Sequence, residues 1–327
     1  MNKIFHGFYA ILLLLLVSVQ SNKWTGKKEH VDDLDKLFTH VEGDSGSVQD
    51  DLFFYLGQKF PGMKPEKFAP NLISKSDEHE FGSVFSKDAT EFYYGVDIEG
   101  KAEIRSARLE NGIWTSPMPL IAHERFSFND PFLSPDEKRL YYISNMSRDG
   151  SEVPKDYDIW YSSRTDSGWS DPVHAGDSIN TGANEYYSSF TNDGSIYFAS
   201  NFAATEERKH DFDIYKSKFQ NGSFQAPHRL NQNINSRQYE ADVFVAPDES
   251  HMIFSSVRRE GHGQCDLYIS FRDQHDDWKE ARNMGELINT KGHERCPFVT
   301  RDGKYFFYIS DRDIYWVDAG ILKNYNN

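Results

Sequence analysis

Residues 184–200 read NEYYSSFTNDGSIYFAS and contain the unit from which the rest of the chain is built. An alternating segment leads to Asp193-Gly194, and a segment rich in aromatic and β-branched residues follows, which predicts a tight β-hairpin. The turn aspartate recurs at separations of 48, 57, 55 and 54 residues, as Asp88, Asp136, Asp193, Asp248 and Asp302. The chain is therefore a repeat protein in which each repeat begins with such a hairpin.

Three further features recur in the same order within the repeats. A third strand is predicted at Asp-Ile or Asp-Leu before an aromatic residue, and a fourth at an aromatic residue that Pro or Ala follows three positions later. A linker Ile-Asn-Thr/Ser then places a glutamate five residues after its Asn. Four short antiparallel strands repeated around an axis form a propeller blade, and a closed ring leaves no long unpaired edge. We predict an all-β protein with a single β-propeller of five four-stranded blades, six being the less favoured count.

The ring is expected to close between the two ends of the repeat region. The last repeat, residues 293–321, runs out after its third strand. Residues 68–72, Phe-Ala-Pro-Asn-Leu, have the aromatic-then-Pro character of the missing fourth strand. We therefore expect an N-terminal strand at 69–73 to pair with 313–319 and complete the C-terminal blade.

The hairpin turns differ in one residue. Only Asp193 and Asp302 precede the glycine that favours a tight turn, whereas Ala89, Glu137 and Glu249 stand there in the other three repeats. Because these residues disfavour the left-handed conformation, we expect those three turns to be longer or of another type.

The repeats resemble a known family. Residues 132–136 (FLSPD), 85–88 (FSKD) and 299–303 (VTRDG), each followed by an aromatic strand that ends in Ser, look like the Pro-Asp-Gly repeat of TolB-type WD-like β-propellers. The resemblance covers about residues 68–320. It implies export to the periplasm or beyond, and binding of protein partners at a mouth of the central channel.

The N-terminal region is predicted to direct export. Residues 1–21 combine Lys3, an apolar run at 8–17 and small residues before Asn22, which is typical of a cleaved signal peptide. An uncleaved membrane anchor is the alternative, but the apolar run is about half the roughly 20 residues that a spanning helix needs. Residues 22–51 are a polar linker or short helix, and 52–327 are the propeller domain. The mature protein is expected to be periplasmic or extracellular, with no membrane span.

The charge balance limits the partners. The formal net charge is −15, and removal of residues 1–21, which carry one lysine and no acid, brings it to −16. Such a charge argues against nucleic acid and against an anionic membrane surface. We expect a protein or carbohydrate partner; the oligomeric state is left open. Cys265 and Cys296 are the only cysteines, and their pairing in an oxidising compartment is left open.

Recurring acids are the first candidates for a site. They would line the axis at a channel mouth, and Arg295 and Tyr186 are adjacent candidates; the predicted binding residues are Glu80, Asp130, Glu185, Glu240, Glu294, Arg295 and Tyr186. A bound Ca²⁺ is one use of clustered carboxylates, although no cofactor is expected. The alternative is that each glutamate bonds backbone donors of the neighbouring blade. A metal site at His123 and His293 is not favoured, because their distances to the turn aspartate differ.

The function predicted from these features is binding. The chain lacks a Gly-x-Ser-x-Gly elbow, a phosphate-binding glycine loop and a His-Glu-x-x-His helix. We therefore expect an interaction module without catalysis of its own. The alternative is a carbohydrate-active hydrolase or lyase that uses two or three of the channel-mouth acids as acid and base. Tyr186, Tyr239 and Phe202 are the aromatic residues considered for ligand stacking.

Overall fold

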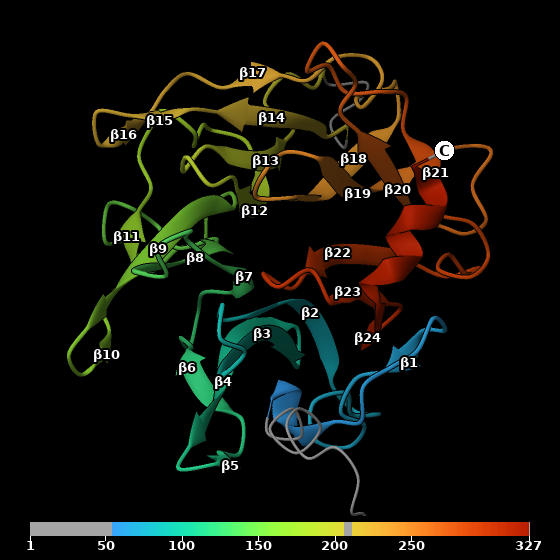
Figure 1. Cartoon of the computed structure of the whole chain (residues 1–327). Coiled ribbons are helices and arrows are strands. Elements are labelled where there is room, and N and C mark those ends of the chain that lie inside the picture. The colour runs from blue at the N-terminus through green and yellow to red at the C-terminus, as the bar shows by residue number, and fades with distance from the viewer. Residues whose placement is uncertain (1–53, 206–210, 327) are drawn as a thin grey trace, which may run out of the picture. The chain divides into compact units, whose positions relative to one another are not determined.

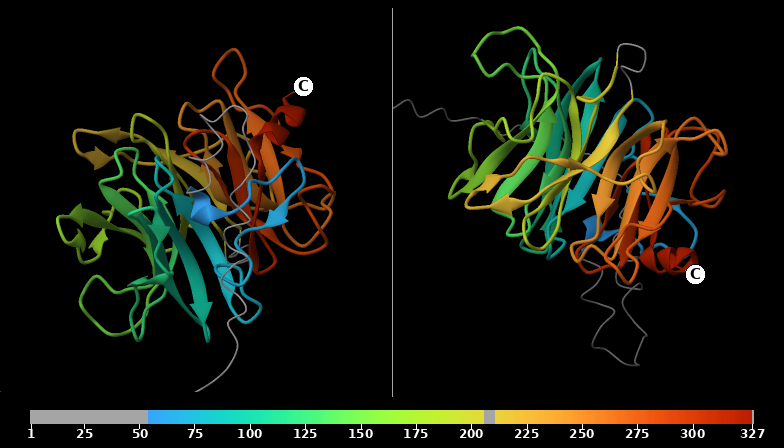
Figure 2. Two further views of the ribbon diagram at one scale, coloured as in Figure 1. Left: turned by 60° about the horizontal axis from the view of Figure 1, so that its bottom comes forward. Right: turned by 90° about the horizontal axis from the view of Figure 1, so that it is seen from above.

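The described strands form a five-bladed propeller (Figures 1 and 2). The computed structural model describes residues 54–205 and 211–326, which belong to one compact unit. The predicted signal peptide and the segment 22–51 lie outside the described residues. No helix between residues 54 and 326, within the described part, has the length and hydrophobicity of a membrane span.

Each blade is an antiparallel sheet whose strands follow one another along the chain. Blade 1 contains β2 (His79–Phe85), β3 (Glu91–Ile98), β4 (Lys101–Glu110), β5 (Ile113–Trp114) and β6 (Met118–Ile121). Blade 2 contains β7 (Phe128–Leu133), β8 (Arg139–Ser144), β9 (Asp158–Thr165), β10 (Gly168–Trp169) and β11 (Val173–His174). Blade 3 contains β12 (Glu185–Phe190), β13 (Ile196–Ser200), β14 (Asp213–Ser217) and β17 (His228–Arg229), with a side hairpin of β15 (Phe219–Gln220) and β16 (Ser223–Phe224). Blade 4 contains β18 (Tyr239–Val245), β19 (His251–Val257), β20 (Asp266–Phe271) and β21 (Arg282–Asn283). Blade 5 contains β22 (Glu294–Val299), β23 (Tyr305–Ser310), β24 (Asp313–Asp318) and β1 (Glu66–Lys67). Two 3₁₀ helices, η3 (Tyr55–Gly57) and η5 (Ala319–Tyr325), flank the strands.

The ring closes between β1 and β24, as predicted, but the closing strand begins three residues earlier than expected. Glu66 pairs with Trp316 and Lys67 with Tyr315, and the Phe68 amide donates to the Ile314 carbonyl. The expected strand at 69–73 is wrong, because Ile73 N donates to the Ala69 carbonyl and this segment is a turn. The fourth strands of blades 2, 3 and 4 also contain two residues, so the short closing strand is typical of these repeats.

The prediction of different turns in three hairpins is also wrong. Ala89, Glu137 and Glu249 have φ of 55°, 56° and 58°, the same left-handed region that Gly194 and Gly303 occupy. In each hairpin the amide of this residue donates to the carbonyl three positions earlier. The preceding aspartate explains this tolerance, because its Oδ1 accepts the amide two positions further on and holds the turn; these aspartates are Asp88, Asp136, Asp193, Asp248 and Asp302.

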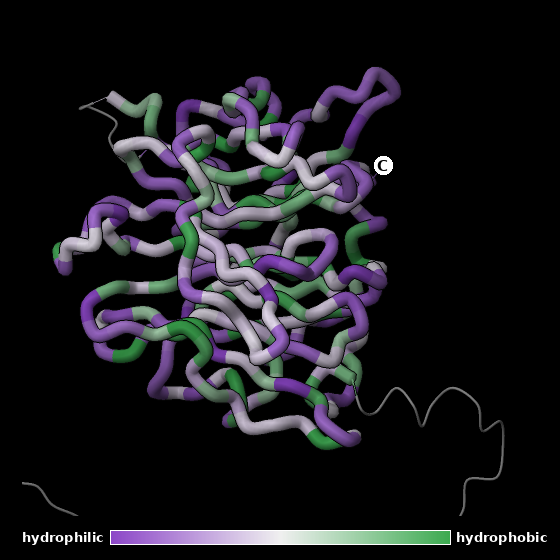
Figure 3. Tube along the Cα trace, turned by 90° about the vertical axis from the view of Figure 1, so that its left-hand side faces the viewer, coloured by the Kyte–Doolittle hydropathy of each residue, from purple (hydrophilic) through white to green (hydrophobic). Residues whose placement is uncertain are grey.

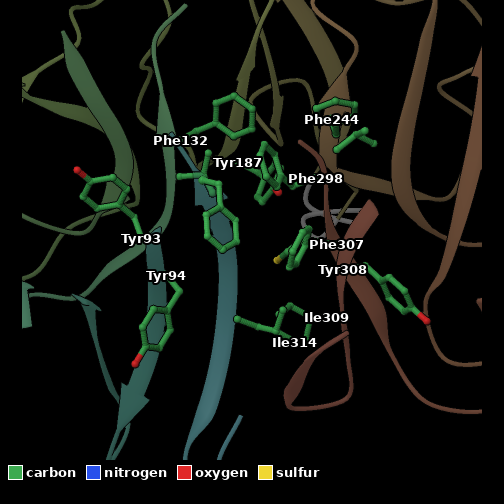
Figure 4. Packing of buried hydrophobic residues seen from close by; sticks show 14 of the residues in the cluster. Tyr93, Tyr94, Phe132, Tyr187, Phe244, Phe298, Phe307, Tyr308, Ile309 and Ile314 are labelled. Atoms are coloured by element: carbon green, nitrogen blue, oxygen red, sulfur yellow. The ribbon is translucent and has the colours of Figure 1, made fainter. Parts of the chain in front are cut away.

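The core lies between the blades and across the axis (Figure 4). Phe298 of β22 lies 5.8 Å from Phe132 of β7 and 6.1 Å from Phe244 of β18, measured between ring centroids. Blades 2 and 5 are not neighbours, so the contact between their rings crosses the axis. Hydrophobic residues follow the strands and hydrophilic ones gather in the outer loops (Figure 3).

Candidate functional site

The four repeated glutamates are internal structural groups. All are fully buried, and none lines the cavity described below. The Glu185 carboxylate accepts from Thr181 N (3.1 Å) and Thr181 Oγ1 (2.8 Å), and also from Ser200 Oγ (2.8 Å). Glu240 and Glu294 repeat this arrangement with the equivalent linker and strand residues, which are Ser236, Ser256, Thr290 and Ser310. These contacts agree with the alternative that each glutamate accepts hydrogen bonds from backbone donors. The backbone donors lie in the linker that leads from the preceding blade.

Glu80 is the exception among these glutamates. Within the described residues, the only hydrogen bond to its side chain is a long one from Lys75 N, 3.4 Å, and its Oε2 is buried without a partner. Burial raises the pKa of Glu80 to about 8 and the pKa of Glu185 to about 7. Both shifts follow from the loss of water around a carboxylate.

A cavity of about 610 Å³ opens near the start of the inner strands. It is lined by residues from all five blades, namely Phe81, Asn129, Asp130, Ile143, Tyr157, Tyr186, Gln238, Tyr239, Asp242, Val257, Cys265, His293, Arg295 and Cys296. Its volume is in the range of pockets that hold small ligands.

Bulges in the inner strands form the floor of this cavity. The residue two positions after each glutamate position is left-handed in blades 2 to 5, with φ of 53° at Asp130, 47° at Tyr187, 46° at Asp242 and 51° at Cys296. The equivalent residue of blade 1 is Gly82. A Cβ there would lie 2.9 Å from Asp130 Oδ1 and 3.0 Å from Tyr187 Cε2, so only glycine fits beside these two side chains.

Tyr187 spans the axis just below the floor. Its hydroxyl donates to the Pro297 carbonyl at 2.7 Å, which links blade 3 to blade 5. The side chain is 2% exposed, and the rings of Phe132, Phe244 and Phe298 lie near it (Figure 4). Aromatic side chains therefore fill the axis beneath the cavity.

Two carboxylates lie at the floor. Asp130 Oδ1 accepts from Gly82 N at 3.2 Å and from Cys296 Sγ at 3.7 Å, and the residue is 8% exposed. Burial, with a smaller contribution from the Asp242 charge, raises the pKa of Asp130 to about 7. Asp242 Oδ2 accepts from Ser255 Oγ at 2.8 Å, and burial raises the pKa of Asp242 as well. The floor can therefore hold a proton or a positive charge near neutral pH.

Arg295 is the cation of the cavity wall. Its Nη2 donates to His79 Nε2 at 2.8 Å and to the Asp311 carbonyl at 3.2 Å, and its guanidinium carbon lies 5.8 Å from the Phe81 ring centroid. Burial, followed by the charge of Arg295, lowers the pKa of His79. A neutral His79 accepts the hydrogen bond and holds the guanidinium against the wall.

Aromatic residues form the wall on the side of blades 2 to 4. Tyr186 stacks on Phe212 with centroids 4.8 Å apart, and Tyr157 meets Tyr186 edge-on at 5.7 Å. Tyr239 packs edge-on against the other end of this row, 5.5 Å from Phe212. Such rings offer apolar contact area together with hydroxyl groups.

The structure brings only some of the predicted residues together. Asp130, Tyr186 and Arg295 line one cavity, and Tyr239 and His293 line it with them. His123 lines a different cavity, of about 560 Å³, while Phe202 packs on Tyr215. No group of three or more His, Cys, Asp or Glu in the described part of the chain is arranged to hold a metal ion.

Sequence reasoning missed Asp242, Asn129 and the cysteines as cavity residues. Cys265 and Cys296 are both buried, unpaired and part of the lining. The sequence did contain a signal for some of these cavity residues, because the position two residues after each repeated glutamate forms the bulge of the inner strand. That position varies among Gly, Asp, Tyr and Cys, unlike the positions that build the blades.

Comparison with known proteins gives distant similarities. No family model matches the sequence, and no curated protein matches it. Among solved structures, the chain is similar to TolB from Acinetobacter baumannii at 14% identity and a TM-score of 0.46, over 72% of this chain and 53% of that one. A TolB from Agrobacterium tumefaciens has 16% identity and a TM-score of 0.46, over 71% and 70%. A puromycin-hydrolysing peptidase from Mycobacterium tuberculosis has 13% identity and a TM-score of 0.44, over 76% and 38%.

The chain spans about half the length of the A. baumannii protein. The assignment of five blades comes from the strand pairing itself. The strand pairing confirms the predicted five-bladed propeller, and the recurring aspartate turns resemble those of TolB-type propellers.

Proposed function

We propose that this chain is an exported β-propeller that binds a partner protein or a carbohydrate in its axial cavity, without catalysis of its own. The observation that supports binding is a single open cavity to which all five blades contribute side chains. Apolar and aromatic walls with a few convergent polar groups are the usual form of a ligand site. Export to the periplasm or the cell exterior is proposed from residues 1–21 and from the resemblance of the repeats.

The experiment compares two aromatic substitutions in a binding screen. The purified mature protein is screened against polysaccharides and envelope extracts, and each hit is measured with Tyr186→Ala and with Phe202→Ala. Tyr186 lines the cavity, whereas Phe202 is 43% exposed and lies outside it. We expect Tyr186→Ala to weaken binding about tenfold or more, because it removes a stacking surface, and Phe202→Ala to leave it unchanged. Equal affinities for all three proteins would place the binding surface elsewhere.

A carbohydrate-active hydrolase or lyase is the second candidate. Of the five acids first considered for it, Asp130 alone lines the cavity, and Asp242 joins it there. A buried carboxyl whose pKa is about 7, beside a second carboxyl, has the protonation behaviour of a general acid. Release of product from any polysaccharide in the same screen, abolished in Asp130→Asn, would favour this enzyme over the binding module.

A further inference from the structure

We propose that the axial cavity binds an organic cation, a primary ammonium or guanidinium group, at Asp130 and Asp242, with the attached carbon chain along the tyrosine wall. This inference rests on the proposed binding function and specifies the chemistry of the group that enters deepest. The group can belong to a lysine or arginine of a partner protein or to an amino sugar. These sources share the same charge and hydrogen-bond donors.

The floor offers acceptors that the protein does not use. Asp130 is more than nine-tenths buried, and within the described residues only its Oδ1 receives hydrogen bonds, so Oδ2 is free toward the cavity. The side-chain oxygen of the neighbouring Asn129 is buried and has no partner there either. Asp242 accepts from Ser255 Oγ through Oδ2, and the Cys296 amide also contributes a hydrogen bond to this carboxylate. Buried acceptors without donors are costly, and a ligand that brings several N–H donors removes this cost.

Charge favours a cation over a neutral donor. The charge of Arg295 lowers the pKa of both aspartates, but less than burial raises it, and the Nη2 of Arg295 donates to His79 and to the Asp311 carbonyl instead of to either carboxylate. Both carboxylates sit in surroundings that disfavour their ionised forms, and an incoming ammonium would compensate this effect. The electron-rich faces and hydroxyls of Tyr157, Tyr186 and Tyr239 suit the alkyl chain and the edge of a cationic group.

The same geometry links binding to protonation. Burial and the Asp242 charge place the pKa of Asp130 at about 7, so part of the free protein carries a proton there at neutral pH. A bound cation favours the ionised form, and binding therefore releases a proton. The charged and titratable groups that face Asp130 are Asp242 of β18, Arg295 and Cys296 of β22, and Tyr186 and Tyr187 of β12; His293 lines the same cavity.

The test uses two pairs of probes in calorimetric titrations of the purified protein. Nα-acetyl-lysine methylamide is compared with its Nζ-acetylated form, and glucosamine with N-acetylglucosamine. Within each pair acetylation removes the charge on nitrogen and adds an acetyl group, and the two pairs separate a peptide source from a sugar source. We expect the charged member of at least one pair to bind roughly tenfold to a hundredfold more tightly than the neutral one. Affinity should fall as the pH drops below about 7, where Asp130 is protonated.

Asparagine variants isolate the carboxylates without disturbing the backbone. Asn tolerates the left-handed φ of 53° and 46° at positions 130 and 242, so Asp130→Asn and Asp242→Asn should fold, which thermal melting verifies. Both are expected to abolish the preference for the charged probe, and Asp130→Asn to abolish proton release. Asp166→Asn, at an exposed acid in the turn after β9, is the matched control and should behave as the wild type.

The outcomes separate the two proposals. Equal binding of charged and neutral probes, or no binding of either, overturns the cation proposal and leaves the binding function to the Tyr186 comparison. A pH dependence that survives in Asp130→Asn would assign it to another group such as His293 and overturn the role of Asp130. Loss of the proposed function would instead appear as partner binding that is unaffected by Tyr186→Ala.

Discussion

At the residue scale, the repeated glutamate has different surroundings in blades 3 to 5 from those in blade 1. In blades 3 to 5 it is buried with three or more hydrogen bonds from a linker and a strand, which stabilises a carboxylate inside the protein. In blade 1 the Glu80 side chain accepts one long bond, 3.4 Å from Lys75 N, within the described residues, and its Oε2 has no partner there. The same residue type therefore has several hydrogen-bond donors in three blades and few in the first.

Glu80→Gln should stabilise the protein above neutral pH. The pKa of Glu80 is raised from 4.5 to about 8 in the folded protein, so the folded state holds a proton that the unfolded chain loses. This contribution to stability is complete below pH 4.5 and is lost as the pH rises to about 8. We expect a gain of about 1–3 kcal/mol at pH 8 and little change at pH 4.5, measured by urea unfolding.

The matched variant of this prediction is Glu240→Gln, because Glu240 has hydrogen-bond donors and an ion pair with Arg258 at 3.5 Å. It should lower stability at both pH values. Equal effects of the two substitutions would contradict the distinction between the glutamates.

At the scale of the element, an asparagine in the outgoing linker of blades 2, 3 and 4 clamps this linker to the third strand of the same blade. Asn235 Oδ1 accepts from Ile214 N at 2.7 Å, and its Nδ2 donates to the carbonyls of Ile214 (2.9 Å) and Leu230 (3.2 Å). Asn180 and Asn289 clamp β9 and β20 in the same way. In the closing blade Ser74 takes this place, with bonds of 3.2 and 3.4 Å to Ile314 N and O. The asparagine or serine side chain thus continues the hydrogen bonding to the third strand beyond the point where the two-residue fourth strand ends.

Asn235→Ala should cost more than Ser74→Ala. The first removes three hydrogen bonds to buried backbone groups, although the Ile214 carbonyl keeps its bond from Leu230 N, for about 2–3 kcal/mol, and the second releases two longer bonds, for about 1 kcal/mol. Urea denaturation of each variant measures the difference in the free energy of unfolding. A larger loss for Ser74→Ala would mean that the clamp matters most at the closure.

At the scale of the whole molecule, the ring is held by one aromatic wedge between its first and last blades. Phe68 is completely buried, and its ring lies 5.9 Å from Phe85 and 5.4 Å from Phe92 in blade 1. On the other side it lies 5.1 Å from both Phe307 and Trp316 in blade 5. The closing strand itself pairs over only two residues, so side-chain packing contributes most of the closure.

Phe68→Ala should lower the free energy of unfolding by about 3–5 kcal/mol, the usual cost of deleting a buried aromatic ring. Calorimetry should still show one transition, because the blades share a continuous core. Phe202→Ala, at an exposed ring, is the control and should change stability by less than about 0.5 kcal/mol. A separate early transition in Phe68→Ala would show that the blades unfold independently.

The candidate site was predictable only in part. Asp130, Tyr186 and Arg295 were placed at the channel mouth from their positions in the repeat, and the structure brings them together. The repeated glutamates stand one or two residues before these positions in the repeat, yet they point into the protein. In three of the blades the linker residue four positions before the glutamate donates hydrogen bonds to it. Asp242 stands two residues after Glu240, the same repeat position as Asp130, and the two aspartates come together because their blades meet at the axis.

By itself, the sequence determined the repeats, the five blades and the closure of the ring, since these follow from local hairpin patterns that recur in phase along the chain. The tertiary structure alone decided the register of β1, the left-handed turns at Ala89, Glu137 and Glu249, and the composition of the cavity. These features have a common physical cause. A backbone conformation that is unfavourable for one residue becomes stable when side chains from other parts of the chain form contacts with it. The cavity floor depends on such contacts across the axis, which no local pattern encodes.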